Sequence, residues 1–164
     1  MAARPGAALI LLCGFSGWVK TALAERLAGG VPAVRLCPDA WMAALGIGLF
    51  DECMRGRLEG WLWEHARELL RLGRAVILEF GFWARSERDE KRAGARALGV
   101  SVELHCLAAP VDGLCRRLEA CSREGGPGTV PVGRELIEEY VKLFQAPGDD
   151  EPALFGEPSL GRRG

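Results

Sequence analysis

The stretch from Gly14 to Thr21, GFSGWVKT, contains the residue types that bind and transfer phosphate groups. Its spacing follows the phosphate-binding loop GxxxxGK plus Ser or Thr, in which backbone N–H groups at a helix start surround phosphate oxygens. Lys20 has the position that pairs with the β- and γ-phosphates, and the Thr21 hydroxyl has the position that ligates Mg²⁺. The residues predicted to bind nucleotide are Gly14, Phe15, Ser16, Gly17, Trp18, Val19, Lys20 and Thr21.

One position of this loop departs from the motif. Val19 stands where the pattern has glycine, and a branched side chain there costs about 1–3 kcal/mol if the loop needs a positive φ. Phosphate binding is still expected, because Gly17 is retained and neither Lys20 nor the helix dipole depends on residue 19. Two interpretations stay open: an active phosphotransferase, and a degenerate module that binds a nucleotide or another phosphate-bearing ligand without turnover.

Two further segments carry a resemblance to a known family. They read CPDAWM (37–42) and EFGFWARSERD (79–89), and each follows an apolar run. Together with the loop, they resemble the small P-loop kinase-like ATP-binding proteins of the zeta-toxin and chloramphenicol-phosphotransferase group, in particular a bacterial subgroup with PDxW and FGFWxRxERD segments. The resemblance covers about residues 8–155. It implies ATP and Mg²⁺ as cofactors, and γ-phosphate transfer to a hydroxyl of a small molecule such as an antibiotic or a nucleotide-sugar.

The resemblance also implies roles for residues that follow the strands. Asp39 would accept the proton of the acceptor hydroxyl, although Asp is equally a favoured helix N-cap. Glu79, where the subgroup more often has Asp, would order Mg²⁺ through water or pair with a nearby Arg. A lid at about 116–132 would carry arginines to the moving phosphoryl group, but the Arg usual near Cys121 is absent. The other candidates are Arg117 and Arg123 for catalysis beside Lys20, Arg116 for nucleotide, and Trp41, Glu79, Phe82, Trp83, Arg85 and Arg88 for substrate.

An alternating α/β chain is needed to bring these residues together. Nearly continuous apolar runs predict buried parallel strands at 7–13 and 75–82. Further strands are predicted at 33–37 and 100–108, with PALF (152–155) as a short fifth strand. Helices are predicted at 20–29, 39–46, 51–73, 86–99, 111–124 and 133–145. The expected fold is a three-layer P-loop NTPase fold, with a mostly parallel five-stranded sheet flanked by helices and a small lid. Ligands of such sheets bind beyond the carboxyl ends of the strands.

Composition narrows the classes of partner and compartment. The net charge of −1 argues against a nucleic-acid or membrane-surface binder, and therefore against a 5′-hydroxyl kinase of nucleic-acid ends. No apolar run reaches the roughly 18 residues of a membrane span. Six cysteines without a CxxC pair, and only two His, argue against a zinc site and for a reducing cytoplasm. We expect one domain at 1–155, a disordered tail at 156–164, and a monomer or homodimer that binds nucleotide and a small-molecule hydroxyl acceptor.

Overall fold

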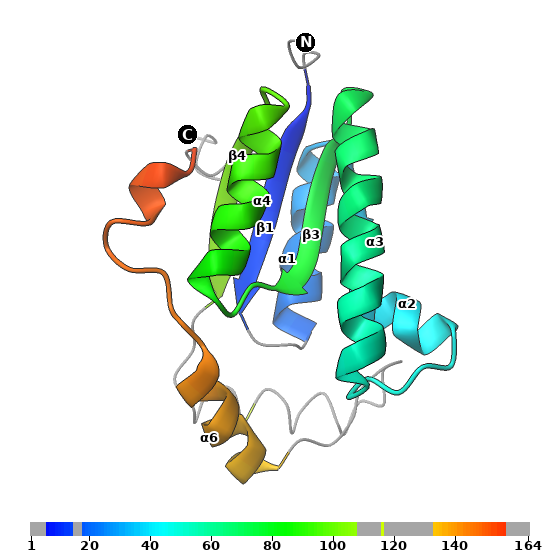
Figure 1. Cartoon of the computed structure of the whole chain (residues 1–164), viewed down its shortest axis with the longest axis vertical. Helices are drawn as coiled ribbons and strands as arrows, with labels where there is room; N and C mark the ends of the chain where they lie inside the picture. The colour runs from blue at the N-terminus through cyan, green and yellow to red at the C-terminus, as the bar shows by residue number, and fades with distance from the viewer. Residues whose placement is uncertain (1–5, 15–17, 108–115, 117–132, 157–164) are drawn as a thin grey trace.

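The computed structural model describes residues 6–14, 18–107, 116 and 133–156. Four parallel strands form one sheet in the order β2-β3-β1-β4 (Figure 1). The strands are β1 (Ala8–Gly14), β2 (Ala33–Leu36), β3 (Ala75–Gly81) and β4 (Ser101–Leu107). The described helices are α1 (Trp18–Gly30), α2 (Pro38–Ala44), α3 (Glu52–Arg71), α4 (Arg85–Ala97) and α6 (Arg134–Leu143).

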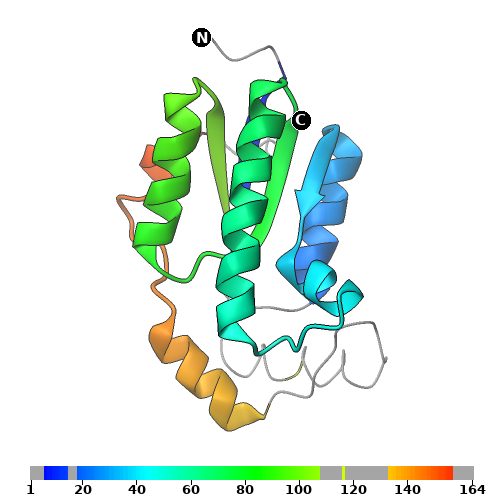
Figure 2. The ribbon, with the colours of Figure 1, turned by 45° about the vertical axis from the view of Figure 1, so that its right-hand side comes forward.

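Helices cover both faces of the sheet, which explains why its two central strands, β1 and β3, are almost continuously apolar. Leu9 and Leu11 of β1 face the core under α3 and α4, while Ile10 and Leu12 face α1 on the other side. Figures 1 and 2 show α3 and α4 together on one face and α1 behind the other. The three layers predicted from the sequence are thereby confirmed. None of the described helices has the length and apolar character that crossing a membrane requires.

The predicted fifth strand is wrong. Residues 152–154 form a 3₁₀ turn (Pro152–Leu154), in which the N–H of Leu154 bonds the carbonyl of Glu151. Pro152 favours this turn because its ring fixes φ and it has no N–H to donate to a ladder. The segment nevertheless reaches the edge of β4, where the N–H of Gly156 donates to the carbonyl of Val102 at 2.7 Å. The predicted helix 111–124, the lid and the tail lie outside the described residues, apart from Arg116 and Gly156.

The connection from β3 to α4 has an unusual backbone. Phe82 has a φ of 49°, in the left-handed region that bulky residues rarely adopt. The carbonyl of Phe82 accepts hydrogen bonds from Arg88 Nη1 at 2.9 Å and from Cys13 Sγ at 3.4 Å. Trp83 Nε1 donates to the carbonyl of Gly14 at 3.3 Å. The turn is therefore attached to the end of β1, directly before the phosphate-loop residues.

Candidate active site

The junction of β1 and α1 provides the expected setting for a phosphate. Gly14 has a φ of 145°, and a Cβ there would lie 3.0 Å from the carbonyl oxygen of Leu107, so the position requires glycine. Because α1 begins at Trp18, Lys20 and Thr21 lie in its first turn, where free N–H groups and the helix dipole attract anions. Phe15, Ser16 and Gly17, and the side chains of Trp18 and Val19, lie outside the described part of the structure.

Lys20 is a buried cation at this helix start. Its side chain is only 4% exposed, and it forms no hydrogen bond or salt bridge with any other described residue. Burial lowers the pKa of the Lys20 ammonium below its ordinary 10.5, and the negative charges of Asp39 and Glu79 partly oppose this effect. A buried charge is costly unless it is paired and hydrogen-bonded. The ammonium is thus available to an anion, and phosphate oxygens fit that need.

Thr21 and Glu79 form an oxygen pair beside Lys20. Thr21 Oγ1 donates to Glu79 Oε2 at 3.4 Å, and Glu79 Oε1 accepts from Arg35 Nε at 2.9 Å. Mg²⁺ is usually held by one or two protein oxygens together with waters and substrate phosphates, so this pair fits a Mg²⁺ that is bound with nucleotide. No cluster of three or more His, Cys, Asp or Glu in the described residues would hold a metal by itself. Arg35 is therefore the arginine partner that was considered for Glu79, although nothing in the sequence singled out Arg35.

Asp39 is held by an arginine rather than used as a helix cap. The N-cap of α2 is Cys37, whose side chain makes no capping bond, and Asp39 lies in the first turn. Asp39 Oδ1 accepts from Arg55 Nη2 at 2.7 Å, and the same nitrogen donates to the carbonyl of Leu49 at 2.9 Å. Arg55 Nη1 lies 3.9 Å from Glu59 Oε1. Arg55 therefore fixes the orientation of the predicted base, a contact that no local sequence pattern indicated.

Glu59 has a strongly perturbed carboxyl group in this network. Burial raises the pKa of Glu59 from 4.5 to about 7, and the nearby charge of Glu87 adds to the rise while Arg55 opposes it. Between pH 4.5 and about 7, the unfolded chain has released this proton while the folded protein still holds it. The free energy of unfolding contributed by Glu59 therefore falls as the pH rises through this window.

Glu59→Gln should remove this pH dependence. We expect the variant to unfold at a higher temperature than the wild type at pH 8, with a smaller advantage at pH 5, because the amide carries no charge to bury. Thermal unfolding across that pH range measures the effect. Glu68→Gln, also on α3 but with an exposed side chain, is the matched control and should change little. An advantage of Glu59→Gln that does not vary with pH would contradict the assignment.

The three aromatic residues predicted to contact substrate differ in how exposed they are and in what they pack against. Trp41 on α2 is 47% exposed and open to a ligand, whereas Phe82 is buried and stacks on Phe80 with ring centroids 5.5 Å apart. Trp83 packs edge-on against Tyr140 of α6, with centroids 5.0 Å apart. Figure 1 shows α6 beyond the carboxyl ends of the strands. Trp83 thus joins α6 to the end of β1, and Phe82 belongs to the core.

Arg85 and Arg88 are engaged by the C-terminal segment rather than left open. Arg88 is completely buried, with Nε and Nη2 on the two oxygens of Glu151 and Nη1 on the carbonyl of Gln145. Arg85 Nη2 donates to Asp150 Oδ2 at 2.6 Å. No local sequence pattern indicated these contacts, because the acidic partners lie more than 60 positions further along the chain. Arg116 is helical and exposed, and Arg117 and Arg123 lie outside the described residues.

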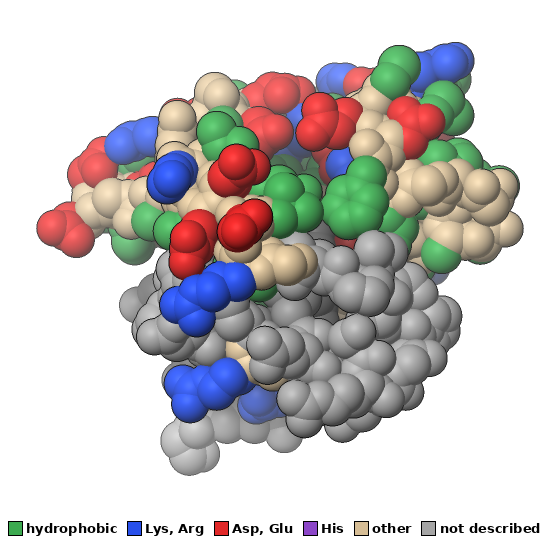
Figure 3. Space-filling model, turned by 90° about the horizontal axis from the view of Figure 1, so that it is seen from below, with side chains coloured by type: hydrophobic (Ala, Val, Ile, Leu, Met, Phe, Trp, Pro, Cys, Tyr) green, Lys and Arg blue, Asp and Glu red, His purple; other side chains and the backbone are tan. Residues whose placement is uncertain are grey.

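The structure thus brings Lys20, Thr21, Asp39 and Glu79 together at the carboxyl edge of the sheet. The Thr21–Glu79 hydrogen bond and the charges of Asp39 and Glu79 felt at Lys20 define this cluster. Figure 3 looks at the molecule from this edge and shows Asp and Glu side chains beside hydrophobic ones on its described part. These residues come from three different helix and strand ends, as expected for a site beyond parallel strands.

The parallel sheet and its flanking helices match the fold of the P-loop NTPases of the kinase type. The chain belongs to the AAA domain family, whose model matches residues 9–147. A comparison with curated proteins finds no significant match.

Solved structures share the fold at low sequence identity. A gluconokinase from Sinorhizobium meliloti 1021 is 18% identical with a TM-score of 0.65, over 91% of this chain and 81% of that one. A provisionally assigned kinase from Chloroflexus aurantiacus j-10-fl is 22% identical with a TM-score of 0.63, over 82% of this chain and 76% of that one. A chain of the Pnkp1/Rnl/Hen1 RNA repair complex gives 17% identity and a TM-score of 0.70, over 85% of this chain but 44% of that one. These likenesses establish the fold.

Proposed function

We propose that this protein is an ATP-dependent phosphotransferase that moves the γ-phosphate to a hydroxyl group of a small molecule. The observation that carries the proposal is the buried Lys20 ammonium, which has no hydrogen-bonding partner among the described residues. It lies at the start of α1 with Asp39 and the Thr21–Glu79 pair around it. A cation for the phosphates, a pair of oxygens for Mg²⁺ and a carboxylate for the acceptor are the parts that phosphoryl transfer needs.

Each residue has one task in this proposal. Lys20 and the N–H groups of the first turn of α1 bind the phosphates, and Thr21 and Glu79 hold Mg²⁺ directly or through water. Asp39 Oδ2 takes the proton of the acceptor hydroxyl, while Arg55 holds Asp39 Oδ1 in place. Bound ATP with Mg²⁺ would supply the activated phosphoryl group and neutralise part of its charge. Arg116, Arg117 and Arg123 are the candidates to neutralise the rest from the lid.

The acceptor belongs to this proposal as well. The PDxW and FGFWxRxERD segments support a place in the zeta-toxin and chloramphenicol-phosphotransferase group, and hence an antibiotic or a nucleotide-sugar as acceptor. Among the structural neighbours, the gluconokinase is named for a small hydroxylated acceptor. Trp41, half-exposed and two residues after Asp39, offers an apolar wall for such a molecule. We therefore propose that the phosphate acceptor is a small molecule and that the reaction takes place in a reducing cytoplasm.

Asp39→Asn tests the proposed reaction. Asn can still accept the hydrogen bond of Arg55 but cannot take a proton, so transfer should fall by about 10²–10⁴-fold while nucleotide affinity is kept. Calorimetric titration with ATP·Mg²⁺ measures the affinity, and ATP consumption against a panel of hydroxyl compounds measures transfer. Asp149→Asn, on the exposed C-terminal segment, is the control and should leave both unchanged.

The outcomes separate the rival functions. Transfer at the wild-type rate in Asp39→Asn would show that Asp39 is not the base. Tight binding of ATP·Mg²⁺ by the wild type without transfer to any acceptor would favour the non-catalytic binding module instead. No binding of ATP·Mg²⁺ by the wild type would remove both interpretations.

A further inference from the structure

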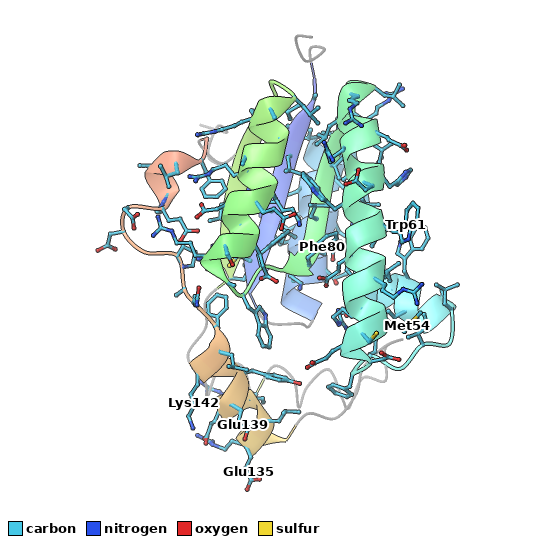
Figure 4. All side chains as sticks on the ribbon, viewed as in Figure 1. Met54, Trp61, Phe80, Glu135, Glu139 and Lys142 are labelled. Atoms are coloured by element: carbon cyan, nitrogen blue, oxygen red, sulfur yellow. The ribbon has the colours of Figure 1, made fainter. Side chains whose placement is uncertain are left out.

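The outward face of α3 carries an unusually exposed tryptophan. Trp61 is 75% exposed, and Figure 4 shows it projecting sideways from α3, on the side opposite α4. Beside it is a shallow depression of about 280 Å³, lined by Gly56, Arg57, Gly60, Trp61 and Glu64. An exposed aromatic next to a hollow is a typical composition for the centre of a protein–protein contact.

Nothing within the described chain requires these residue types on this face. Leu62, Trp63, Ala66 and Leu70 already bury the opposite side of α3 against the sheet. A Cβ at Gly56 or Gly60 would meet no atom within 4 Å, so neither glycine is there to make room inside the molecule. Glycine weakens a helix interior relative to alanine. Glycines at these two positions would, however, let a second surface approach α3 closely.

Arg57 and Glu64 on this face could form ion pairs with the same two residues of a second copy. Arg57 and Glu64 lie on either side of Gly60 and Trp61, two turns apart and about 10 Å along the helix axis. Arg57 makes no hydrogen bond or salt bridge with any residue in the described ranges, whereas Glu64 accepts from Arg67 at 3.1 Å. If two copies of α3 lie antiparallel about a two-fold axis at residues 60 and 61, each Arg57 faces the Glu64 of the other copy. In a two-fold interface, every contact between two different residues occurs twice, once from each copy.

We propose that the occupant of this face is a second copy of the chain, with α3 packed antiparallel against its symmetry mate. Trp61 of each copy fills the depression at Gly56 and Gly60 of the other, and two Arg57–Glu64 pairs flank the indoles. A pair of single helices buries less than the roughly 1,600 Å² of a standard stable interface. The dimer is therefore a reversible one, with a dissociation constant on the order of micromolar. This proposal is independent of the phosphotransferase function.

A charge swap across the two-fold axis is the decisive experiment. In Arg57→Glu the new carboxylate faces Glu64 of the mate, and in Glu64→Arg two arginines face each other, so each single variant should dissociate at least tenfold more readily. The double variant Arg57→Glu with Glu64→Arg restores opposite charges and should recover most of the wild-type affinity. Sedimentation equilibrium over a concentration series from about 1 µM to several hundred µM measures all four proteins.

Trp61→Glu tests the same interface through its apolar centre. The side chain is outside the core, so the variant should fold, as circular dichroism can verify, but dissociate at least tenfold more readily. Leu72→Glu, at the exposed end of α3, is the matched control and should dimerise normally. The proposal is overturned if the wild type is monomeric throughout the series, which would leave the face to another partner. It is equally overturned if the double variant fails to recover or if Trp61→Glu dimerises like the wild type.

Discussion

Lys20→Ala is expected to lower the affinity for ATP·Mg²⁺ by at least about a hundredfold, or about 2.7 kcal/mol, and to leave the fold intact. Lys20 is the in-register cation of the loop, and its ammonium forms no hydrogen bond or salt bridge with the rest of the described chain. Removing a buried, unpaired charge does not harm the free protein. The melting temperature without ligand should therefore stay the same or rise, whereas the stabilisation that ATP confers on the wild type should disappear.

Calorimetry and ligand-dependent melting measure this result. Lys142→Ala removes an exposed lysine from α6 and is the matched control, with affinity expected to be unchanged. Because burial lowers the pKa of Lys20, the wild-type affinity should also fall as the pH rises through that lowered pKa, at a pH below the ordinary 10.5. ATP affinity equal to that of the wild type in Lys20→Ala would refute the phosphate-loop assignment.

Arg88→Met is expected to be the most destabilising single change, at about 3–5 kcal/mol, because it strands the buried Glu151 carboxylate without its partner. It also removes the donors to the carbonyls of Phe82 and Gln145, and so loosens the strained turn before α4. For a chain of this size, such a loss corresponds to a fall in melting temperature of roughly 6–20 °C.

A double variant separates the charge from the packing. Arg88→Met combined with Glu151→Leu leaves no unpaired charge and should recover a large part of the lost stability. Arg85→Met removes the exposed pair with Asp150 and is the control, with only a small expected change. Because Arg88 holds the pKa of Glu151 below its usual 4.5, the wild type should also lose this contribution as the pH falls through that lowered pKa. A melting temperature of Arg88→Met close to that of Arg85→Met would contradict the role given to the buried pair.

The sequence by itself determined the architecture and the centre of the site. Nearly continuous apolar runs identified β1 and β3, because strands buried on both faces have no polar alternation. The loop spacing placed Lys20 and Thr21 at a helix start, since that relation depends only on neighbouring residues. The prediction for residues 152–155 failed, because four residues carry too little pattern to distinguish a strand from a 3₁₀ turn that starts at a proline.

Only the tertiary structure decided which side chains hold the site in place. Arg35 reaches Glu79 across 44 positions, Arg55 reaches Asp39 across 16, and Arg88 reaches Glu151 across 63. In the sequence, Arg35 and Arg55 looked like ordinary charged residues of a strand and a helix surface, and Arg88 was a candidate for substrate binding. Its partner is set by which chain segments the sheet brings together, and the energy of the pair depends on burial, which is a property of the whole fold. The motif around Arg88 was therefore visible in the sequence, but the buried ion pair by which Arg88 holds the C-terminal segment was not.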